Sequence, residues 1–288
     1  MNDLLESFIV PPNTRIDLKS VPTKMPDIAL DKDGLRALTE KNGKKLFELQ
    51  YRLYAENSQS LLVVLQAMDA AGKDGVINHV AVHFNPQGCR CVSFKAPSTL
   101  ERSHDFLWRI HAQAPARGEI AIFNRSHYED VLAARVHELV PKKVWKERFR
   151  AINDFERLLS ENRTKVVKFF LHISREEQLK RFGARLKTEE KRWKISESDY
   201  RERSLWDEYM EAFEEVFQKC STKRAPWFVI PSDSKPFRDF VFSELLVRIL
   251  QDMKIRMPSP KVDVELARSW YERELNASVG GGEETPEE

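Results

Sequence analysis

The segment that decides the fold runs from Leu61 to Gly75 and reads LLVVLQAMDAAGKDG. Its first five residues are all apolar, without the alternation of a half-exposed strand, which is typical of a strand buried on both faces of a sheet. Small residues follow and end in Gly72-Lys73, after which the pattern is helical. Such a loop can direct backbone N–H groups at a phosphate, and the lysine adds a positive charge. The segment predicts a phosphate-binding loop, although an ordinary turn between a strand and a helix has the same outline.

The loop departs from the common phosphate-binding pattern at two positions. Ala67 stands where the first glycine is usual, and Asp74 replaces the hydroxyl residue that normally follows the lysine and holds magnesium. Asp69, inside the loop, offers a carboxylate instead. Because Mg²⁺ prefers carboxylate, water and phosphate oxygens, Asp69 is the candidate metal ligand.

Length and composition exclude several classes of protein. A chain of 288 residues favours one large α/β domain over two small ones, and its net charge of +2 argues against a protein devoted to nucleic acid. Three cysteines are too few for a disulfide framework and indicate a reducing compartment, while Cys89-x-Cys91 has no second pair with which to hold a metal. The sequence shows neither a secretory signal pattern nor a membrane-spanning apolar run, so we expect a cytoplasmic protein without membrane contact.

The chain divides into three parts. Residues 1–31 are rich in proline and predict an extended arm lying against the domain. Residues 32–257 predict an α/β domain that begins with a helix over Lys32–Gln59. Residues 258–288 form an extension whose acidic end, Gly280–Glu288, we expect to be disordered. The five predicted strands are Leu61–Gln66, Cys89–Phe94, Glu119–Phe123, Lys165–Leu171 and Trp227–Ile230.

Two capping boxes mark helix starts after the second and fourth predicted strands. They are Ser98-Thr99-Leu100-Glu101, which begins a helix reaching Arg109, and Ser174-Arg175-Glu176-Glu177. His79 and His83 lie four residues apart on another predicted helix and could face one metal ion, but we favour ordinary packing or solvent-facing histidines. The other predicted helices are Val76–Phe84, Lys142–Asn162, Asp199–Cys220 and Phe237–Met257.

A pair of helices joined by a basic hinge predicts a lid over about residues 180–205. The helix that starts at Ser174 carries Arg181 and Arg185 on one face, four residues apart. A polar segment over Lys187–Ser198 separates it from the next helix and contains Lys191 and Lys194. Small-molecule kinases close such lids over phosphates. A surface hairpin with solvated charges is the alternative, because the same segment also holds glutamates.

The ends of three predicted strands bring polar residues together. In an open parallel sheet, ligands bind beyond the carboxyl ends of the strands. The strands ending at Gln66, Phe94 and Phe123 are therefore expected to open onto one crevice. The polar residues that follow these ends are Asp69, Lys73, Lys95, Asn124 and Arg125.

Seven segments in a fixed order form a specific set of motifs. They are AMDAAGKDG (Ala67–Gly75), FNPQGCRCVSFKAPS (Phe84–Ser98), HDFLWR (His104–Arg109), FNRSHYEDVL (Phe123–Leu132), KRFGAR (Lys180–Arg185), KRWKIS (Lys191–Ser196) and APWFVIPSDSK (Ala225–Lys235). With this set the chain resembles the polyphosphate kinase 2 family from about Phe47 to Met253. The resemblance implies a P-loop kinase-like three-layer fold, with a mostly parallel five-stranded sheet flanked by helices and a helical lid. It also implies an enzyme that transfers phosphate from inorganic polyphosphate to nucleotides with Mg²⁺ or Mn²⁺.

The segment FNRSHYED, with Asn124 and Glu129, resembles the subgroup that accepts both nucleoside mono- and diphosphates. Other members of the family carry aspartate where this chain has Asn124, which bears on the subgroup and on metal binding. In the lid, Thr188-Glu189 stands where Asp-Pro is common, which bears on the rigidity of the lid. The resemblance further implies a homodimer or homotetramer.

Resemblance and residue chemistry together give each candidate a role, with Asp69 as the metal ligand. Phosphoryl transfer needs alignment and charge neutralisation more than covalent help, so cations from the loop and the lid are expected around the transferred group. The predicted catalytic residues are Asp69, Lys73, Asn124, Arg125 and Arg185. Phosphate and polyphosphate binding is assigned to Ala70, Ala71, Gly72, Lys73, Asp74, Gly75, Arg181, Lys191 and Lys194. Nucleotide binding is assigned to Lys95, Arg109, Arg125, His127 and Glu129.

Three functions from different classes are open on the sequence. The favoured one is reversible transfer of the terminal phosphate of polyphosphate to ADP or AMP, with guanine nucleotides as further candidates. The second is an ATP-dependent nucleoside monophosphate kinase, and the third is a non-catalytic module that binds polyphosphate or nucleotides. The loop aspartate favours the first over the second, because it implies a different arrangement of the metal.

Overall fold

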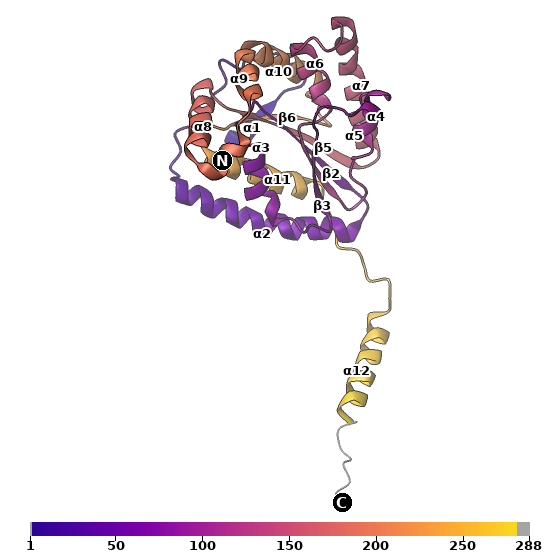
Figure 1. The fold of residues 1–288 in the computed structure, drawn as a ribbon. Coiled ribbons are helices and arrows are strands. Elements are labelled where there is room, and N and C mark those ends of the chain that lie inside the picture. Colours follow the sequence, from indigo (N-terminus) through magenta and orange to yellow (C-terminus); the bar gives the residue numbers. More distant parts are fainter. Residues whose placement is uncertain (1, 281–288) are drawn as a thin grey trace, which may run out of the picture. The chain divides into compact units, whose positions relative to one another are not determined.

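A six-stranded sheet lies at the centre of the residues up to Ile255, with the strand order β1-β6-β5-β2-β4-β3 (Figure 1). The computed structural model describes residues 2–280, with side chains for residues 3–278. All neighbouring strands are parallel except β1, which runs antiparallel to β6. The strands are β1 Ile9–Val10, β2 Ser60–Gln66, β3 Cys89–Ser93, β4 Ile120–Asn124, β5 Thr164–His172 and β6 Trp227–Pro231.

Helices cover both faces of the sheet and complete the three-layer α/β fold that the sequence predicts. On one side, α2 (Lys32–Glu56) packs along α11 (Lys235–Asp252), and α3 (Lys73–His79) packs beside α11. On the other side, α10 (Trp206–Cys220) packs against α7 (Lys142–Glu161), as Figure 1 shows. No helix among residues 2–280 has the length and apolar character needed to cross a membrane.

The sequence predicted five strands and missed the additional edge strand, β1. A strand of two residues is too short to show a hydrophobic period, and β1 is held by contacts with residues far away in the sequence. Ile9 and Val10 pair with β6, and the hydroxyl of Ser221 donates to the carbonyl of Val10. Leu5 and Leu18, from the same N-terminal segment, are buried in the core. The predicted arm therefore lies against the domain and contributes to its core, and its first residues form a short helix, α1 (Asn2–Glu6).

Several predicted helices are shorter or interrupted. The one after the loop ends at His79 and continues as a 3₁₀ turn over Ala81–His83, and the helix predicted from Asp199 is broken at Leu205. The first capping box is present, but the helix it starts, α4, is followed by a separate short helix, α5. The remaining helices are α4 Thr99–Arg102, α5 Trp108–His111, α6 Ala133–Val136, α8 Arg175–Lys187 and α9 Glu197–Ser204, with 3₁₀ turns at His127–Asp130 and Glu189–Lys194.

The second compact unit begins at Arg256, two residues before the predicted boundary. It contains a helix, α12 (Val264–Gly280), that the sequence did not lead us to expect. The tail predicted to be disordered, Gly280–Glu288, lies outside the described residues except for its first residue, which ends this helix.

Strand register places the ends of three strands at one level. Leu65 on β2 pairs with Asn124 on β4, and Asn124 pairs with Ser93 on β3. Every residue of β2 is buried, as the unbroken apolar run predicts. The segments that leave β2, β3 and β4 therefore start side by side at the carboxyl edge of the sheet.

A buried ionic network underlies the segment that follows β4. The ammonium of Lys168 on β5 donates to the carboxylate of Glu156, to the hydroxyl of Tyr128 and to the carbonyl of Cys220. Glu156 also accepts from Tyr128 and lies 3.3 Å from His127 Nε2. Burial by itself raises the pKa of Glu156, but the ammonium of Lys168 and the hydrogen bonds outweigh this effect and leave the pKa below its ordinary value.

Replacing Lys168 by methionine should destabilise the protein strongly. The substitution leaves the carboxylate of Glu156 buried without its cation, which typically costs about 3–5 kcal/mol. Urea denaturation followed by circular dichroism measures the change in apparent unfolding free energy. The double variant Lys168→Met with Glu156→Gln serves as the control, because it removes both charges. A single variant as stable as the double variant would show that the ion pair does not hold this part of the core.

Candidate active site

A cavity of about 580 Å³ lies at the carboxyl edge of the sheet. It is lined by the phosphate-binding loop, by residues that follow β3 and β4, and by residues of the predicted lid. The five polar residues that the sequence predicts at strand ends all line it, namely Asp69, Lys73, Lys95, Asn124 and Arg125.

The loop has a backbone conformation suited to anions. Ala70 and Gly72 have positive φ angles of 60° and 114°, and successive residues of alternating conformation can turn neighbouring N–H groups toward one point. For an alanine this conformation costs roughly 1–2 kcal/mol, so the surroundings must hold it in place. A side chain at Gly72 would bring its Cβ within 1.8 Å of the Arg238 guanidinium, so only glycine fits there.

Four successive N–H groups of the loop are available to a ligand. Within the part of the chain that the structure describes, those of Gly72, Lys73, Asp74 and Gly75 donate to no acceptor of the protein. Unsatisfied N–H groups beside a lysine are what a phosphate requires. The backbone of the loop therefore has the form of a phosphate-binding loop, as the sequence predicts.

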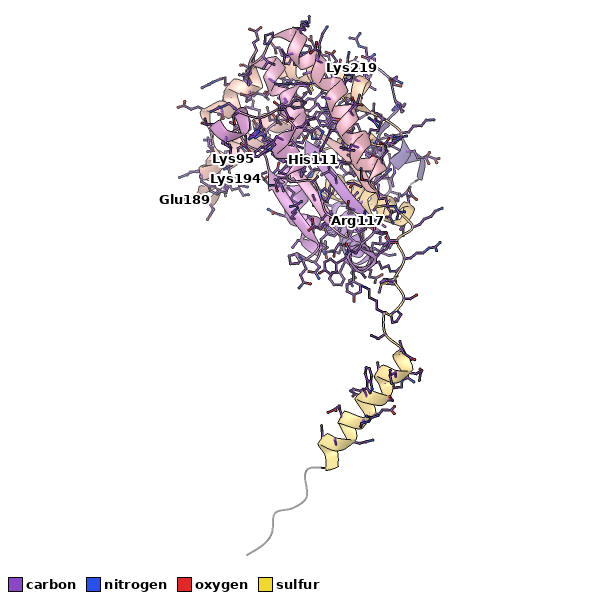
Figure 2. The ribbon with its side chains drawn as sticks, turned by 90° about the vertical axis from the view of Figure 1, so that its right-hand side faces the viewer. Lys95, His111, Arg117, Glu189, Lys194 and Lys219 are labelled. Carbon is purple, nitrogen blue, oxygen red and sulfur yellow. The ribbon has the colours of Figure 1, made fainter. Side chains whose placement is uncertain are left out.

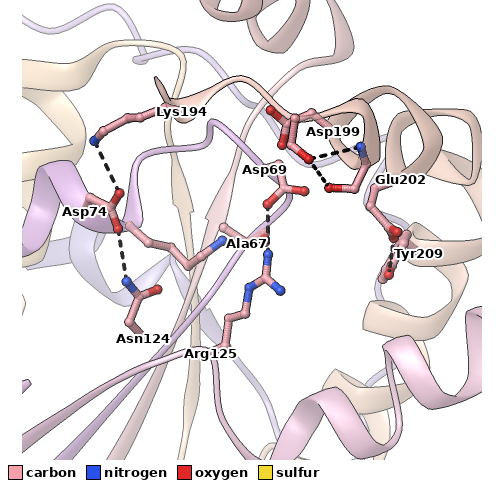
Figure 3. A network of polar contacts seen from close by, with 12 residues as sticks. Ala67, Asp69, Asp74, Asn124, Arg125, Lys194, Asp199, Glu202 and Tyr209 are labelled. Carbon is pink, nitrogen blue, oxygen red and sulfur yellow. Dashed lines mark hydrogen bonds and ion pairs between the residues drawn. The ribbon is translucent and has the colours of Figure 1, made fainter. Parts of the chain in front are cut away.

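Asp69 and Arg125 form an ion pair across the cavity. Arg125 Nη2 donates to Asp69 Oδ1 at 3.1 Å, and the two side chains are 46% and 22% exposed (Figure 3). Burial works against the charge on Arg125, but the carboxylates of Glu129 and Asp69 outweigh it and raise its pKa. The carboxylate of Asp69 thus faces the cavity and lies beside the Asn124–Arg125 pair, not in the core.

Lys73 points back along the loop. Its ammonium donates to the carbonyl of Ala67 at 2.9 Å. Burial lowers the pKa of Lys73, and the charges of Asp69, Glu129 and Asp74 only partly oppose this effect. A partly buried cation whose charge is incompletely balanced by nearby carboxylates is well suited to an added anionic ligand.

Asp74 connects the sheet to the lid. Its carboxylate accepts from Asn124 Nδ2 at 3.0 Å and lies 3.6 Å from the ammonium of Lys194 (Figure 3). Its side chain is 63% exposed, so it is open to solvent as well. The negative charge of the Asp74 side chain repels phosphate. Only the backbone N–H group of Asp74 can therefore make the predicted phosphate contact.

The predicted lid lines one side of the cavity. Arg185, Lys191 and Lys194 all border it, and Figure 2 shows Lys194 on the same side of the domain as Lys95. The guanidinium of Arg185 donates to Asp199 Oδ2 at 3.1 Å and to the carbonyl of Lys194 at 3.3 Å. These contacts tie the end of α8 to the start of α9.

Arg181 departs from its predicted role as a lid cation that binds polyphosphate. It is buried, and its five N–H donors are all engaged by protein acceptors. The capping box expected before it is only half formed, because the Ser174 N–H donates to Asp233 and the Glu177 carboxylate pairs with Arg181. A guanidinium with no free donor cannot bind phosphate without first leaving these contacts. The acceptors are Glu177 and the carbonyls of Ala70, Ala71, Ser232 and Asp233.

Three predicted nucleotide-binding residues, Arg109, His127 and Glu129, do not line the cavity. Arg109 is buried, donates to the carbonyl of Lys95 at 2.8 Å and lies over the ring of Phe94. It therefore braces the segment that carries Lys95. His127 is fully buried beside Glu156, where burial lowers its pKa. His127 therefore lies on the core side of a segment whose Asn124 and Arg125 line the cavity.

Glu129 instead lines a smaller cavity, and Asp69 and Arg125 line both this cavity and the larger one. His79 and His83 are not a metal pair, because His79 bonds to Asp239 at 2.8 Å while His83 lies 3.9 Å from Glu40. Among the residues that the structure describes, no group of three or more histidine, cysteine or acidic side chains is arranged to hold a metal ion. Any divalent ion at the site would therefore need ligands from substrate or water.

The structure adds three residues that the sequence did not single out. Lys235 and Arg238, from the start of α11, line the cavity, and Gln178 contacts the loop from α8. Lys235 lies just beyond the end of β6, so the strand-end rule used for the other strands would have found it. Burial and the nearby cations Arg181, Arg238 and Lys191 lower the pKa of Lys235. No sequence pattern marks Gln178 or Arg238.

Comparison with known proteins identifies the family. The family model described as Polyphosphate kinase 2 (PPK2) matches residues 29–258, which is most of the chain. The chain belongs to the polyphosphate kinase 2 family. A polyphosphate kinase 2 crystal structure from Arthrobacter aurescens TC1 is 40% identical, covers 93% of this chain and 96% of its own, and superposes with a TM-score of 0.90.

Two curated relatives of this member of the polyphosphate kinase 2 family match over nearly their whole length. The AMP/ADP-polyphosphate phosphotransferase of Meiothermus ruber is 45% identical and covers 91% of this chain and 98% of its own. The ADP-polyphosphate phosphotransferase of Rhodopseudomonas palustris is 42% identical and covers 88% of this chain and 92% of its own. The P-loop kinase-like α/β fold is confirmed by the close match to the solved structure, with six strands in the sheet instead of the predicted five.

Proposed function

We propose that this protein is a polyphosphate:nucleotide phosphotransferase that transfers the terminal phosphate of inorganic polyphosphate to ADP and AMP. The observation that carries the proposal is the composition of one cavity. A loop with free N–H groups, the Asp69–Arg125 pair and the lid cations Arg185, Lys191 and Lys194 all line it. Relatives with matching length are named as AMP/ADP- and ADP-polyphosphate phosphotransferases.

Mg²⁺, with Mn²⁺ as an alternative, fits the residues present. The partly exposed carboxylates of Asp69 and Asp74 and the amide of Asn124 line the cavity, and these are the hard oxygen donors that Mg²⁺ prefers. Mg²⁺ usually binds through one or two carboxylates together with waters and substrate phosphates, which suits a site without a larger acidic cluster. When bound, such an ion neutralises phosphate charge and aligns the two substrates.

The side chains supply charge and alignment rather than covalent chemistry. The attacking oxygen of a nucleotide phosphate is already ionised near neutral pH, so no general base is required. Lys73 and the loop N–H groups would hold oxygens of the transferred phosphate, and Arg125 would neutralise charge at the point of transfer. Arg185 and Lys194 would approach from the lid, while Lys95 is the candidate for the phosphates of the accepting nucleotide.

The decisive experiment supplies ADP, Mg²⁺ and long-chain polyphosphate to the purified protein and measures ATP. ATP should form with no other phosphate donor present, and its formation should stop when EDTA is added. Parallel reactions with AMP, GMP and GDP then give the nucleotide preference. Transfer between phosphoanhydrides is nearly isoenergetic, so starting from ATP the same protein should make polyphosphate.

Two other outcomes would overturn the proposal. Phosphorylation of AMP by ATP, without any product from polyphosphate, would identify an ATP-dependent nucleoside monophosphate kinase. Binding of polyphosphate or nucleotide without turnover would identify a binding module. Assembly into a homodimer or homotetramer remains part of the proposal, and light scattering measures it directly.

A further inference from the structure

Two side chains of α8 hold successive carbonyl groups of the phosphate-binding loop. Gln178 Nε2 donates to the carbonyl of Asp69 at 2.9 Å. Arg181 Nη1 donates to the carbonyls of Ala70 and Ala71 at 3.0 and 2.9 Å. Every carbonyl from Asp69 to Ala71 is thus bound by a side chain of one helix.

A third side chain reaches the loop from α11. Arg238 Nη1 donates to the carbonyl of Ala71 at 3.2 Å, while its Nε and Nη2 donate to Asp239. Arg238 is 1% exposed, and Gln178 is equally buried. Because Arg181 is also anchored to the carbonyls that follow β6, the loop is connected to two helices and a strand end. We call Gln178, Arg181 and Arg238 the carbonyl clamp.

The clamp determines where the loop N–H groups point. In a trans peptide the C=O of one residue and the N–H of the next point in opposite directions. With the carbonyls of Asp69 and Ala71 held by the clamp, the N–H groups of Ala70 and Gly72 face away from it, and both residues line the cavity. Within the described part of the chain, neither of these N–H groups donates to the protein.

The strained backbone at Ala70 explains why the loop needs the support of the clamp. Ala70 has a φ of 60°, a conformation that L-residues other than glycine and asparagine seldom adopt. Such residues persist only where their surroundings determine the backbone on both sides. The bonds from Gln178 and Arg181 lie at the carbonyl before Ala70 and at its own carbonyl.

We propose that Gln178, Arg181 and Arg238 are positioning residues that hold the phosphate-binding loop in its anion-binding conformation. The proposal rests on the proposed function, since the anion is the phosphate transferred there. It assigns Arg181 to the loop backbone rather than to polyphosphate, and it gives α11 a part in the site.

Substitutions at Arg181 separate this role from that of a phosphate-binding cation. Lysine keeps the charge but cannot supply five donors in a fixed fork. We expect Arg181→Lys and Arg181→Met to lower kcat alike, by about 10²-fold, because misplaced groups rather than a lost charge limit the reaction. Lys180→Met is the matched control, since it removes an exposed charge from the same helix, and kcat should stay within about twofold. If Arg181→Lys kept most of its activity while Arg181→Met lost it, the charge of Arg181 would be what matters, and the proposed clamp would be wrong.

A double-mutant cycle links the clamp to the strain at Ala70. Glycine adopts positive φ without a penalty, so Ala70→Gly makes the loop less dependent on its supports. We expect Gln178→Met to lower kcat less in the Ala70→Gly background than in the natural one, with thermal unfolding followed in parallel. Equal losses in the two backgrounds would show that Gln178 does not act through the loop conformation.

A structural measurement keeps this test separate from that of the proposed function. If the unmodified protein makes no ATP from polyphosphate, the proposed function fails, but the clamp can still be examined by hydrogen exchange. The amide groups of Ala71 and Val76, which donate to the carbonyls of Met68 and Gly72, should exchange faster in Arg181→Lys and Gln178→Met than in Lys180→Met, while the amide groups of the sheet exchange at unchanged rates. Unaltered exchange in both clamp variants would overturn the proposal on its own.

Discussion

Asp69→Asn should lower kcat for transfer from polyphosphate to ADP by about 10²–10³-fold or more. Asparagine has nearly the same shape and can still accept the hydrogen bond from Arg125. The substitution therefore removes the ion pair but leaves no empty space in the packing. What disappears is the negative charge that makes this side chain a ligand for Mg²⁺. Steady-state kinetics over a range of Mg²⁺ concentrations measures the change, and the half-saturating Mg²⁺ concentration should rise.

Asp207→Asn is the matched control for Asp69. This aspartate on α10 is exposed, and its Oδ1 lies 3.8 Å from the ammonium of Lys19. Neither kcat nor the half-saturating Mg²⁺ concentration should change in this variant. An Asp69→Asn protein with substantial activity and unchanged Mg²⁺ dependence would remove Asp69 from the metal site. Asp74 would then be the next carboxylate to examine, because it lines the same cavity.

Lys73→Met should lower kcat by a similar factor, about 10²–10³-fold, while leaving the fold at least as stable. Lys73 is partly buried, and its lowered pKa means that the folded protein disfavours the charge. An apolar side chain of similar length removes that cost along with the charge that holds phosphate. Activity should therefore fall without any decrease in Tm, which thermal unfolding at neutral pH records.

Lys45→Met provides the comparison, since this lysine is exposed on α2, outside the cavity. It should change neither kcat nor Tm. A fall in Tm for Lys73→Met would mean that the lysine mainly supports the structure through the carbonyl of Ala67. Full activity in Lys73→Met would exclude it from phosphate binding.

The strand-end rule accounts for most of the cavity that could be predicted. Parallel strands buried on both faces are visible as apolar runs, and the residues after their carboxyl ends must meet at one edge. Asp69, Lys73 and Asn124 were located in this way, from different segments of the chain. The roles of these residues in catalysis remain predictions until the variants are measured.

The rule says nothing about which side of a segment a residue occupies. His127 lies two residues after Arg125, yet it faces the core while Arg125 faces the cavity. Arg109 and Arg181 look like free cations in sequence, but both are buried by acceptors that come from distant segments. A guanidinium with several donors binds whichever carbonyls the fold brings to it, and these are not visible in a local pattern.

What the sequence by itself determined is the order of the five parallel strands, a loop with the form of a phosphate-binding loop and the residues that follow the strand ends, because hydrophobic period and loop composition are local properties. Only the tertiary structure decided the antiparallel edge strand β1, the burial of Arg109, His127 and Arg181, and the contacts of Gln178 and Arg238 with the loop. Each of these depends on hydrogen bonds between residues far apart in the chain. The partner of a buried polar group is set by which backbone atoms the fold places near it, and that placement exists only after the layers have packed.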